Sequence, residues 1–189
     1  SWESIGLDGV DAFSLYEDPK GKLWLGTAEK GLFYLEGERW KPWEGRDFSG
    51  HMIHAITMDR DGNLWVSYAD GLEVFDSESR PVDIGTSPGQ PQVLFSDSKG
   101  AIWMGTYGAG VVRYFDGRFE TLTHTEGLAS NQVISLAESP DGSIWVGTAD
   151  GLTQILDVKF PTYSIRDGLV ADGVLWTAPD IQNGVWIGT

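Results

Sequence analysis

Cysteine is absent from this 189-residue chain, which excludes disulfide bonds, thiolate nucleophiles and cysteine metal ligands. Basic residues are scarce as well, because 13 Lys and Arg stand against 28 Asp and Glu, for a formal net charge of −15. A field of that sign repels phosphate backbones and anionic lipids, so we expect no nucleic-acid partner and no direct membrane contact by this segment. The acidity itself is typical of a surface that keeps a protein in solution.

Long apolar runs are missing too. No stretch approaches the ~18 consecutive apolar residues of a membrane-spanning helix, and the sequence shows no secretory signal pattern. Proline is sparse, with eight residues against 25 Gly and nine Trp. Abundant Gly and Trp with little Pro favour many short strands joined by tight turns, with large side chains filling the space between sheets.

An apolar-Trp pair recurs five times, and the Trp positions are spaced 41, 38, 42 and 41 residues apart. The surrounding frame reads GKLWLGT, GNLWVSY, GAIWMGT, GSIWVGT and NGVWIGT. A turn-forming Gly precedes each Trp by two or three positions, and a repeat of this length is typical of one blade of a β-propeller. The five residues are Trp24, Trp65, Trp103, Trp145 and Trp186.

Each repeat is predicted to hold four short strands, and the fold to be nearly free of helix. In repeat 4, residues 132–138 (QVISLAE) are apolar on both faces, as a fully buried inner strand should be. A Pro-Asp-Gly turn leads to the Trp-bearing strand 143–148, followed by a third strand at 152–157 and an outer strand at 160–165. Corresponding third and fourth strands are expected at 31–36 and 39–43 in repeat 1, and at 110–115 and 118–122 in repeat 3.

A single blade cannot bury both of its faces, so neighbouring blades must stack. We expect the Trp of each second strand to be largely buried between blades; the alternative is an aromatic platform for a ligand. Residues 1–189 are predicted to form a single all-β propeller domain of about five four-stranded blades, the last of them incomplete.

The two ends of the chain do not complete a ring. Residues 2–5 (WESI) match a fourth strand, whereas the sequence ends after a second strand, and we interpret the chain as a segment of a longer array. Unpaired strand edges invite pairing with another chain, so we expect self-association through the open blade edges.

The frame x-G-x-[LIV]-W-[apolar]-G-T-x-x-G-L resembles the two-component regulator propeller repeat. It stands here as residues 21–27 followed by Gly31-Leu32, and again as residues 142–148 followed by Gly151-Leu152. The linker 126–134 (EGLASNQVI) is also similar to that family's connection into an inner strand. Four repeats have an Asp six residues before the Trp, and repeat 4 has Ser139 there; the four are Asp18, Asp59, Asp97 and Asp180.

This resemblance implies a periplasmic or extracellular sensor region of a bacterial hybrid histidine kinase, a class often linked to carbohydrate sensing. The chain departs from the pattern in repeat 2, where Ser67-Tyr68 replaces Gly-Thr, and it contains no kinase. Sialidase Asp boxes fit less well, because their Asp stands five residues before the Trp. Streptogramin lyases need a His with a metal-linked acidic cluster, and the His residues here are His51, His54 and His124.

Motifs for catalysis or cofactor binding are missing. The sequence has no phosphate-binding Gly loop, nucleophile elbow or zinc-ligand spacing. His51 and His54 form the one close His pair, but residues three apart on a strand point to opposite faces, so we expect no metal and no cofactor. Paired acids such as Asp59 and Asp61 are explained by turn formation. The chain is therefore predicted not to be an enzyme.

Connecting loops are the expected ligand-binding surface, since function tends to sit on loops over a rigid scaffold. The connection 41–54 is the longest, and its aromatic, cationic and imidazole groups together suit a sugar ring with a carboxylate or hydroxyls. Trp40 and Trp43 equally suit outer-strand packing. The candidate ligand-binding residues are Trp43, Arg46, His51, His54, Tyr68 and Tyr107.

The sequence thus predicts a ligand-binding sensor module of a two-component signalling protein, recognising an oligosaccharide or another small extracellular molecule. A scaffold for protein–protein contact, including dimerisation, is the first alternative. A propeller lyase is the second.

Overall fold

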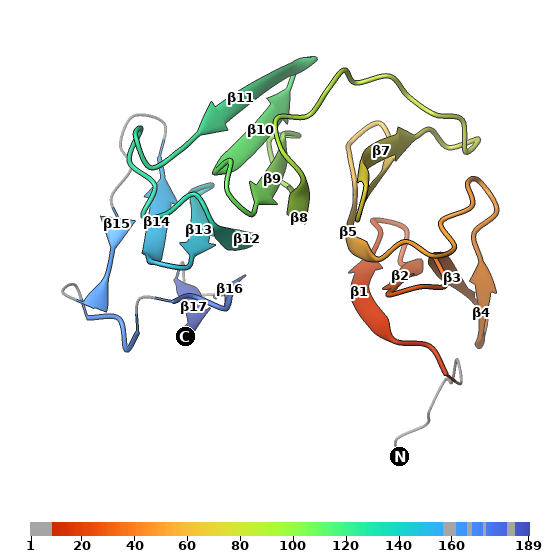
Figure 1. The fold of residues 1–189 in the computed structure, drawn as a ribbon, viewed down its shortest axis with the longest axis horizontal. Coiled ribbons are helices and arrows are strands. Elements are labelled where there is room, and N and C mark those ends of the chain that lie inside the picture. The colour runs from red at the N-terminus through yellow and green to blue at the C-terminus, as the bar shows by residue number, and fades with distance from the viewer. Residues whose placement is uncertain (1–8, 157–161, 166–167, 172, 181–183) are drawn as a thin grey trace. The chain divides into compact units, whose positions relative to one another are not determined.

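The computed structural model describes residues 9–156, 162–165, 168–171, 173–180 and 184–189. The regular elements among them are β-strands, and these form small antiparallel sheets joined by tight turns (Figure 1). The chain divides into two compact parts, Ser1–Asp83 and Ile84–Thr189. The organisation of residues 1–189 as a single domain stays a prediction.

The first part holds two blades. Blade 1 is a sheet in the order β1-β2-β3-β4, and blade 2 is a sheet in the order β5-β6-β7. The strands of blade 1 are β1 (Ala12–Glu17), β2 (Leu23–Thr27), β3 (Leu32–Glu36) and β4 (Arg39–Pro42). Those of blade 2 are β5 (Ile53–Met58), β6 (Leu64–Tyr68) and β7 (Gly71–Phe75).

Blade 2 lacks the fourth strand that we expected in every repeat. After β7 the described chain forms a single bridge, between Phe75 and Pro81, in place of a strand. Beside this bridge the Val82 N–H donates to the Val74 carbonyl at 2.8 Å, and Pro81 itself has no N–H to donate.

The second part holds blades 3 and 4 and the last blade. Blade 3 consists of β8 (Pro91–Ser96), β9 (Ile102–Thr106), β10 (Val111–Phe115) and β11 (Arg118–Leu122). Blade 4 consists of β12 (Val133–Glu138), β13 (Ile144–Thr148), β14 (Gly151–Ile155) and β15 (Thr162–Tyr163), and the last blade of β16 (Trp176–Pro179) and β17 (Val185–Gly188). The first residues of the expected outer strand 160–165 lie outside the described residues, and the strand expected at 2–5 lies wholly outside them.

The Gly of the Gly-Thr frame permits close approach between blades. A Cβ on Gly26 would lie 2.6 Å from Cγ2 of Ile53 in the next blade, and a Cβ on Gly105 would lie 2.6 Å from Cγ1 of Val133. A larger residue would therefore push the next inner strand away from the Trp-bearing strand. The Thr of the frame closes the following turn, because its hydroxyl donates to a Gly carbonyl at 2.7 to 2.8 Å in Thr27, Thr106 and Thr148.

In blades 1 to 3 the acid six residues before the Trp binds both the indole and the turn. One carboxylate oxygen accepts the indole N–H, at 3.1 Å for Asp18–Trp24, 2.9 Å for Asp59–Trp65 and 2.8 Å for Asp97–Trp103. The other oxygen accepts the backbone N–H groups two and four residues later in all three turns. In blade 4 the acceptor for the Trp145 indole is the hydroxyl of Ser139, at 3.1 Å.

These hydrogen bonds also set the ionisation of the acid. Burial by itself would raise the pKa of Asp18, but hydrogen bonds from Lys22, Trp24 and Lys20 outweigh it, so the pKa lies below its ordinary value. A lowered folded-state pKa means that the carboxylate stabilises the fold at neutral pH. That contribution is lost as the pH falls below the ordinary range of an aspartate.

Each part has a hydrophobic core between its own blades. In the first part Trp24 packs with Ile53 and Ile56 of the next blade, and in the second Trp103 packs with residues that include Val133 and Leu136. Trp65 is also buried. Trp145 is partly buried and stacks on Tyr163 with ring centroids 5.8 Å apart.

Trp186 does not follow the expected pattern. Its side chain is 62% exposed, so the prediction that it is buried is wrong. In the other blades a third strand pairs with the Trp-bearing strand, whereas β17 pairs with β16 alone in the described chain.

The inner strands show a similar contrast. Most residues of β5 and β12 are buried on both faces, as expected. β1 differs, because Phe13 is 56% and Leu15 is 66% exposed. Its other face is engaged with blade 2: the Ser14 hydroxyl donates to the Ile53 carbonyl at 3.2 Å, and the Tyr16 hydroxyl accepts the Met58 N–H at 3.1 Å. No blade precedes β1 among the described residues, and the Phe13 ring contacts His54 of β5 at a centroid distance of 6.0 Å.

The loss of stability on truncating a blade Trp should follow how deeply that Trp is buried. Trp103→Ala is expected to lower the free energy of unfolding by about 3–5 kcal/mol, as large aromatic truncations in cores do. The matched change Trp186→Ala, at the same repeat position, should alter it by less than about 0.5 kcal/mol. Chemical denaturation followed by far-ultraviolet circular dichroism measures both, and equal losses would contradict the interpretation.

Removal of one turn acid should destabilise the chain although the residue lies at the surface of a loop. Asp59→Ala leaves the Trp65 indole and two backbone N–H groups without their acceptor, and should cost about 2–3 kcal/mol. Asp61→Ala changes an exposed acid in the same turn and serves as the control, with an expected loss below about 0.5 kcal/mol. Thermal unfolding measures the two variants side by side, and equal losses would contradict the role assigned to Asp59.

Candidate functional site

Blade 2 departs from the repeat frame, and this departure creates a polar cluster. Tyr68 stands where the other blades have the turn-closing Thr, and its hydroxyl donates to Glu73 Oε1 at 2.9 Å. Arg46, from the loop that enters blade 2, donates from Nη2 to the same hydroxyl at 3.3 Å and from Nη1 to Glu73 Oε1 at 2.6 Å. Three elements therefore meet here: the loop after β4, the end of β6, and β7.

Aromatic rings hold the guanidinium in place. The Arg46 Cζ atom lies 5.4 Å from the ring centroid of Phe48 and 5.5 Å from that of Tyr68, which are cation–π distances. Phe48 is fully buried and fixes the loop to the core of the first part. The Arg46 side chain itself remains partly exposed, so it can still meet a ligand.

His51 joins the cluster from the same loop. Its ring meets the edge of the Tyr68 ring at a centroid distance of 5.6 Å, and its Nδ1 lies 2.9 Å from an oxygen of Asp70. Burial, followed by the hydrogen bond to Glu73 and the charge of that residue, raises the pKa of Tyr68. The phenol therefore stays protonated at neutral pH. The cluster offers a cation, an imidazole, a hydroxyl and two carboxylates around aromatic rings, which is a set that suits a polyhydroxylated ligand.

Three other candidate residues lie elsewhere. Trp43 is partly buried, and its ring packs 4.9 Å from Phe75 and 6.4 Å from Trp24, which supports the packing interpretation. His54 lies on β5 beside Phe13, with ring centroids 6.0 Å apart, and burial lowers its pKa. Tyr107 is 72% exposed and belongs to the second part of the chain.

Sequence reasoning missed Glu73 and Asp70, the two acids that partner Arg46 and His51. Glu73 occupies a third-strand position at which blades 1, 3 and 4 have Phe33, Val112 and Thr153. A charged residue at a position that is uncharged in the other blades was the signal that could have revealed it. Asp70 gave no comparable signal, because acids are common in such turns.

Within the described ranges, no group of three or more His, Asp or Glu side chains is close enough to hold a metal ion. The same residues include no helix with the length and apolar character needed to cross a membrane.

The repeats themselves match a known family model. Three segments, residues 6–29, 47–70 and 127–150, match the model described as two component regulator propeller. These three segments are thus similar to two component regulator propeller repeats. The second matched repeat contains His51, Tyr68 and Asp70, so the polar cluster is built on one of these repeats. The repeats around Trp103 and Trp186 lie outside the matched segments although they keep the frame.

Solved structures confirm the propeller fold of these repeats. The extracellular domain of a putative hybrid two component system from Bacteroides thetaiotaomicron matches 99% of this chain with a TM-score of 0.82 and 21% identity. A virginiamycin B lyase from Staphylococcus aureus, solved with quinupristin, matches 96% of it with a TM-score of 0.75 and 15% identity. YCF48 in complex with a peptide matches 98% with a TM-score of 0.67 and 14% identity.

The chain spans 28% of the length of the Bacteroides domain, 64% of the lyase and 63% of YCF48. At these identities the similarity shows the β-propeller fold alone, since the three proteins are a domain of a two component system, a lyase and a peptide-bound protein. No curated protein matches the chain.

Proposed function

We propose that this chain is a ligand-binding segment of the extracellular or periplasmic sensor propeller of a two-component signalling protein. The observation that carries the proposal is that a two component regulator propeller repeat departs from its own frame at Tyr68 and assembles a polar, aromatic cluster there. The similarity of 99% of the chain to the extracellular domain of a hybrid two component system supports the same location and role.

The ligand that suits the cluster is a carbohydrate. Arg46, His51 and Tyr68 can exchange hydrogen bonds with hydroxyl or carboxylate groups, and the rings of Tyr68 and Phe48 back the guanidinium. Binding without turnover is part of the proposal. His51 is paired with Asp70, His54 packs beside Phe13, and neither has the metal-linked acidic surroundings that a propeller lyase needs.

A change at Arg46 should weaken carbohydrate binding without unfolding the protein. Arg46→Gln is expected to reduce the affinity for the best oligosaccharide of a broad array by at least tenfold, because hydrogen bonds from a charged donor are lost. Isothermal titration calorimetry measures the affinity. Arg80→Gln is the matched control, since Arg80 is an exposed arginine of the same part that also pairs with acids. Failure of every oligosaccharide to bind, or equal weakening by the two variants, would refute the proposal.

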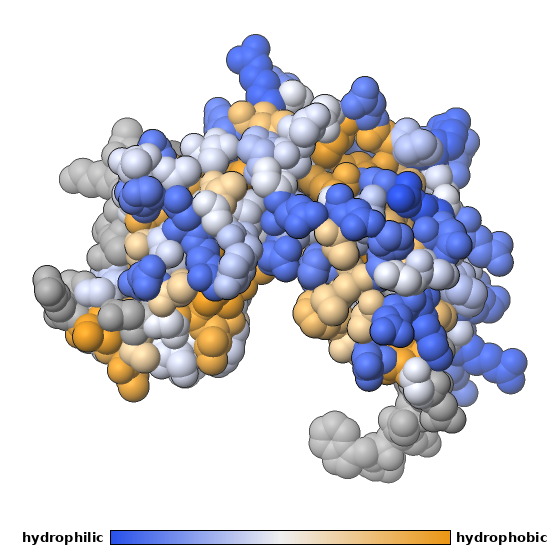
Figure 2. All heavy atoms as spheres, viewed as in Figure 1, coloured by the Kyte–Doolittle hydropathy of each residue, from blue (hydrophilic) through white to orange (hydrophobic). Residues whose placement is uncertain are grey.

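Self-association is the second candidate function, as a scaffold. Within each part, a Trp-bearing strand packs against the inner strand of the next blade. Among the described residues, an inner-strand face is exposed at Phe13 and Leu15 of β1, and a Trp-bearing strand is exposed at Trp186 of β17. In Figure 2, hydrophobic atoms reach the surface near β1 and near the last blade. A second copy can join these faces in a head-to-tail contact.

Sedimentation velocity at low micromolar concentration tests this association. We expect species larger than the 20.7 kDa monomer, and Leu15→Lys should shift the distribution towards the monomer by placing a charge in the contact. Glu17→Lys, on the same strand and exposed, is the control for the added charge. A wild-type chain that sediments as a monomer throughout would exclude the scaffold.

A further inference from the structure

The two parts of the chain fill the same inter-blade space differently. Strand register places Trp24 opposite Tyr34 in blade 1 and Trp103 opposite Arg113 in blade 3, so Tyr34 and Arg113 are equivalent. Trp43 hydrogen-bonds through its backbone to Leu32 next to β4, and Leu122 pairs with Val111 at the same place in blade 3. On the next blade, Phe75 corresponds to Ile155, since each pairs with the residue that precedes the blade Trp.

In the first part, aromatic rings close this space. The Trp43 ring lies 4.9 Å from that of Phe75 and 6.2 Å from that of Phe48. In the second part the smaller Leu122 stands at the position of Trp43, and the smaller Ile155 stands at the position of Phe75. The result is a pocket between blades 3 and 4 with a volume of about 370 Å³. This volume falls at the lower end of the range for small-molecule sites.

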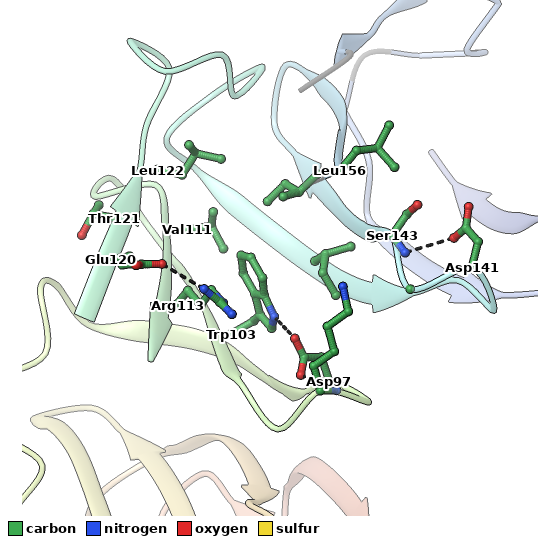
Figure 3. A pocket seen from close by; sticks show the side chains of 14 residues that line it. Asp97, Trp103, Val111, Arg113, Glu120, Thr121, Leu122, Asp141, Ser143 and Leu156 are labelled. Carbon is green, nitrogen blue, oxygen red and sulfur yellow. Dashed lines mark hydrogen bonds and ion pairs between the residues drawn. The ribbon is translucent and has the colours of Figure 1, made fainter. Parts of the chain in front are cut away.

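The pocket has an apolar end and a charged end (Figure 3). Leu122 and Leu156 lie at one end of the opening, above the indole of Trp103. Arg113, Glu120 and Asp97 lie towards the other. The remaining lining residues are Lys99, Val111, Thr121, Asp141, Gly142, Ser143, Ile144 and Ile155.

Arg113 is the charged group best placed to recognise a ligand. It replaces the Tyr34 of the first part, and its Cζ atom lies 5.7 Å from the Trp103 ring and 4.7 Å from the Phe115 ring, so the guanidinium lies beside two aromatic rings. Its ion pair uses Nη1, which lies 3.0 Å from Glu120 Oε2. A guanidinium has five N–H donors and binds a carboxylate in fork geometry.

The acids of the pocket do not remove this preference for an anion. Asp97 already accepts the Trp103 indole N–H and two backbone N–H groups, and Asp141 accepts the Ser139 hydroxyl and the Ser143 N–H. The Glu120 side chain is 67% exposed, and an exposed ion pair contributes little stability. A ligand carboxylate can therefore take the place of Glu120 beside Arg113 at small cost.

We propose that the groove between blades 3 and 4 is a binding site for a small aromatic carboxylate, with the ring between Leu122, Ile155 and Trp103 and the carboxylate on Arg113. The site is separate from the carbohydrate cluster of blade 2, and the ligand class differs. The proposal rests on one difference between the two parts: the aromatic rings of Trp43 and Phe75 fill the inter-blade space in the first part, and Leu122 and Ile155 leave it open in the second.

Indole-3-acetate is the probe, titrated calorimetrically into the full 189-residue chain, with indole-3-acetamide and tryptamine as neutral and cationic analogues. We expect the acid to bind with a Kd below about 1 mM. The amide should bind at least about tenfold more weakly, and the amine should not bind. No binding of the acid, or equal binding of the acid and the amide, would overturn the proposal.

Three variants locate the site. Arg113→Gln should weaken binding of indole-3-acetate at least about tenfold, whereas Glu120→Gln should strengthen it about threefold by removing the competing carboxylate. Changes of the same sign would refute the role of the ion pair. Leu122→Trp restores the filler of the first part and should abolish binding. Unchanged affinity in a folded Leu122→Trp chain would show that the ligand binds elsewhere. If this variant does not fold, Arg113→Gln and Glu120→Gln decide whether the ligand binds in this pocket.

Oligosaccharide titrations of the same variants separate this site from the proposed carbohydrate site. Arg113→Gln should leave oligosaccharide binding unchanged, and Arg46→Gln should leave the binding of indole-3-acetate unchanged. Loss of both ligands in either single variant would contradict the assignment of two independent sites.

Discussion

The hydrogen bond from a Trp indole to a side chain six residues earlier is the interaction on which blades 1 to 4 depend; the acceptor is an Asp in blades 1 to 3 and Ser139 in blade 4. The acid binds the turn through two backbone N–H groups and binds the Trp through the indole, so one side chain joins the β-hairpin to the packing surface of the blade. A buried indole N–H without an acceptor would be costly. With an acceptor in place for its indole N–H, the Trp can be buried against the next blade, where the Gly of the frame allows the following inner strand to approach.

Against this regular background, the irregular positions carry the candidate chemistry. Tyr68 breaks the Gly-Thr frame and gathers Arg46, His51 and Glu73 around it. Leu122 stands where blade 1 has Trp43 and leaves a pocket beside Arg113. In both places the loss of a packing or turn-closing residue is tolerated, because the acid–Trp hydrogen bonds and the inter-blade core remain intact. The residues that stabilise the blades are therefore different from the residues proposed to bind ligands.

The fold could be predicted almost entirely from the sequence, because the Trp frame and its turn residues recur at a nearly constant spacing. The exceptions are local: the segment after β7 forms a single bridge at Pro81 in place of a fourth strand, and in the described chain β17 pairs with β16 alone, which leaves Trp186 exposed. The candidate site could be predicted from the sequence only in part. Arg46, His51 and Tyr68 stood out as unusual loop and frame residues, but their partners depend on which third-strand side chain faces the loop. The pocket at Arg113 depends on how well side chains fill a space, which a pattern of apolar and polar residues does not encode.

The short distance along the chain between each acid and its Trp bears on how this protein acquires its structure. Hairpins closed by partners six residues apart have a small loop-closure entropy, so they can form before any blade meets another. The slow events are then the docking steps between blades, which join residues about 40 positions apart, such as Ser14 with Ile53 and Ser135 with Thr177. Proteins assembled from such nearest-neighbour contacts gain stability one unit at a time. A gene encoding this chain can therefore lengthen or shorten by whole blades during evolution while every remaining blade keeps an intact internal hairpin.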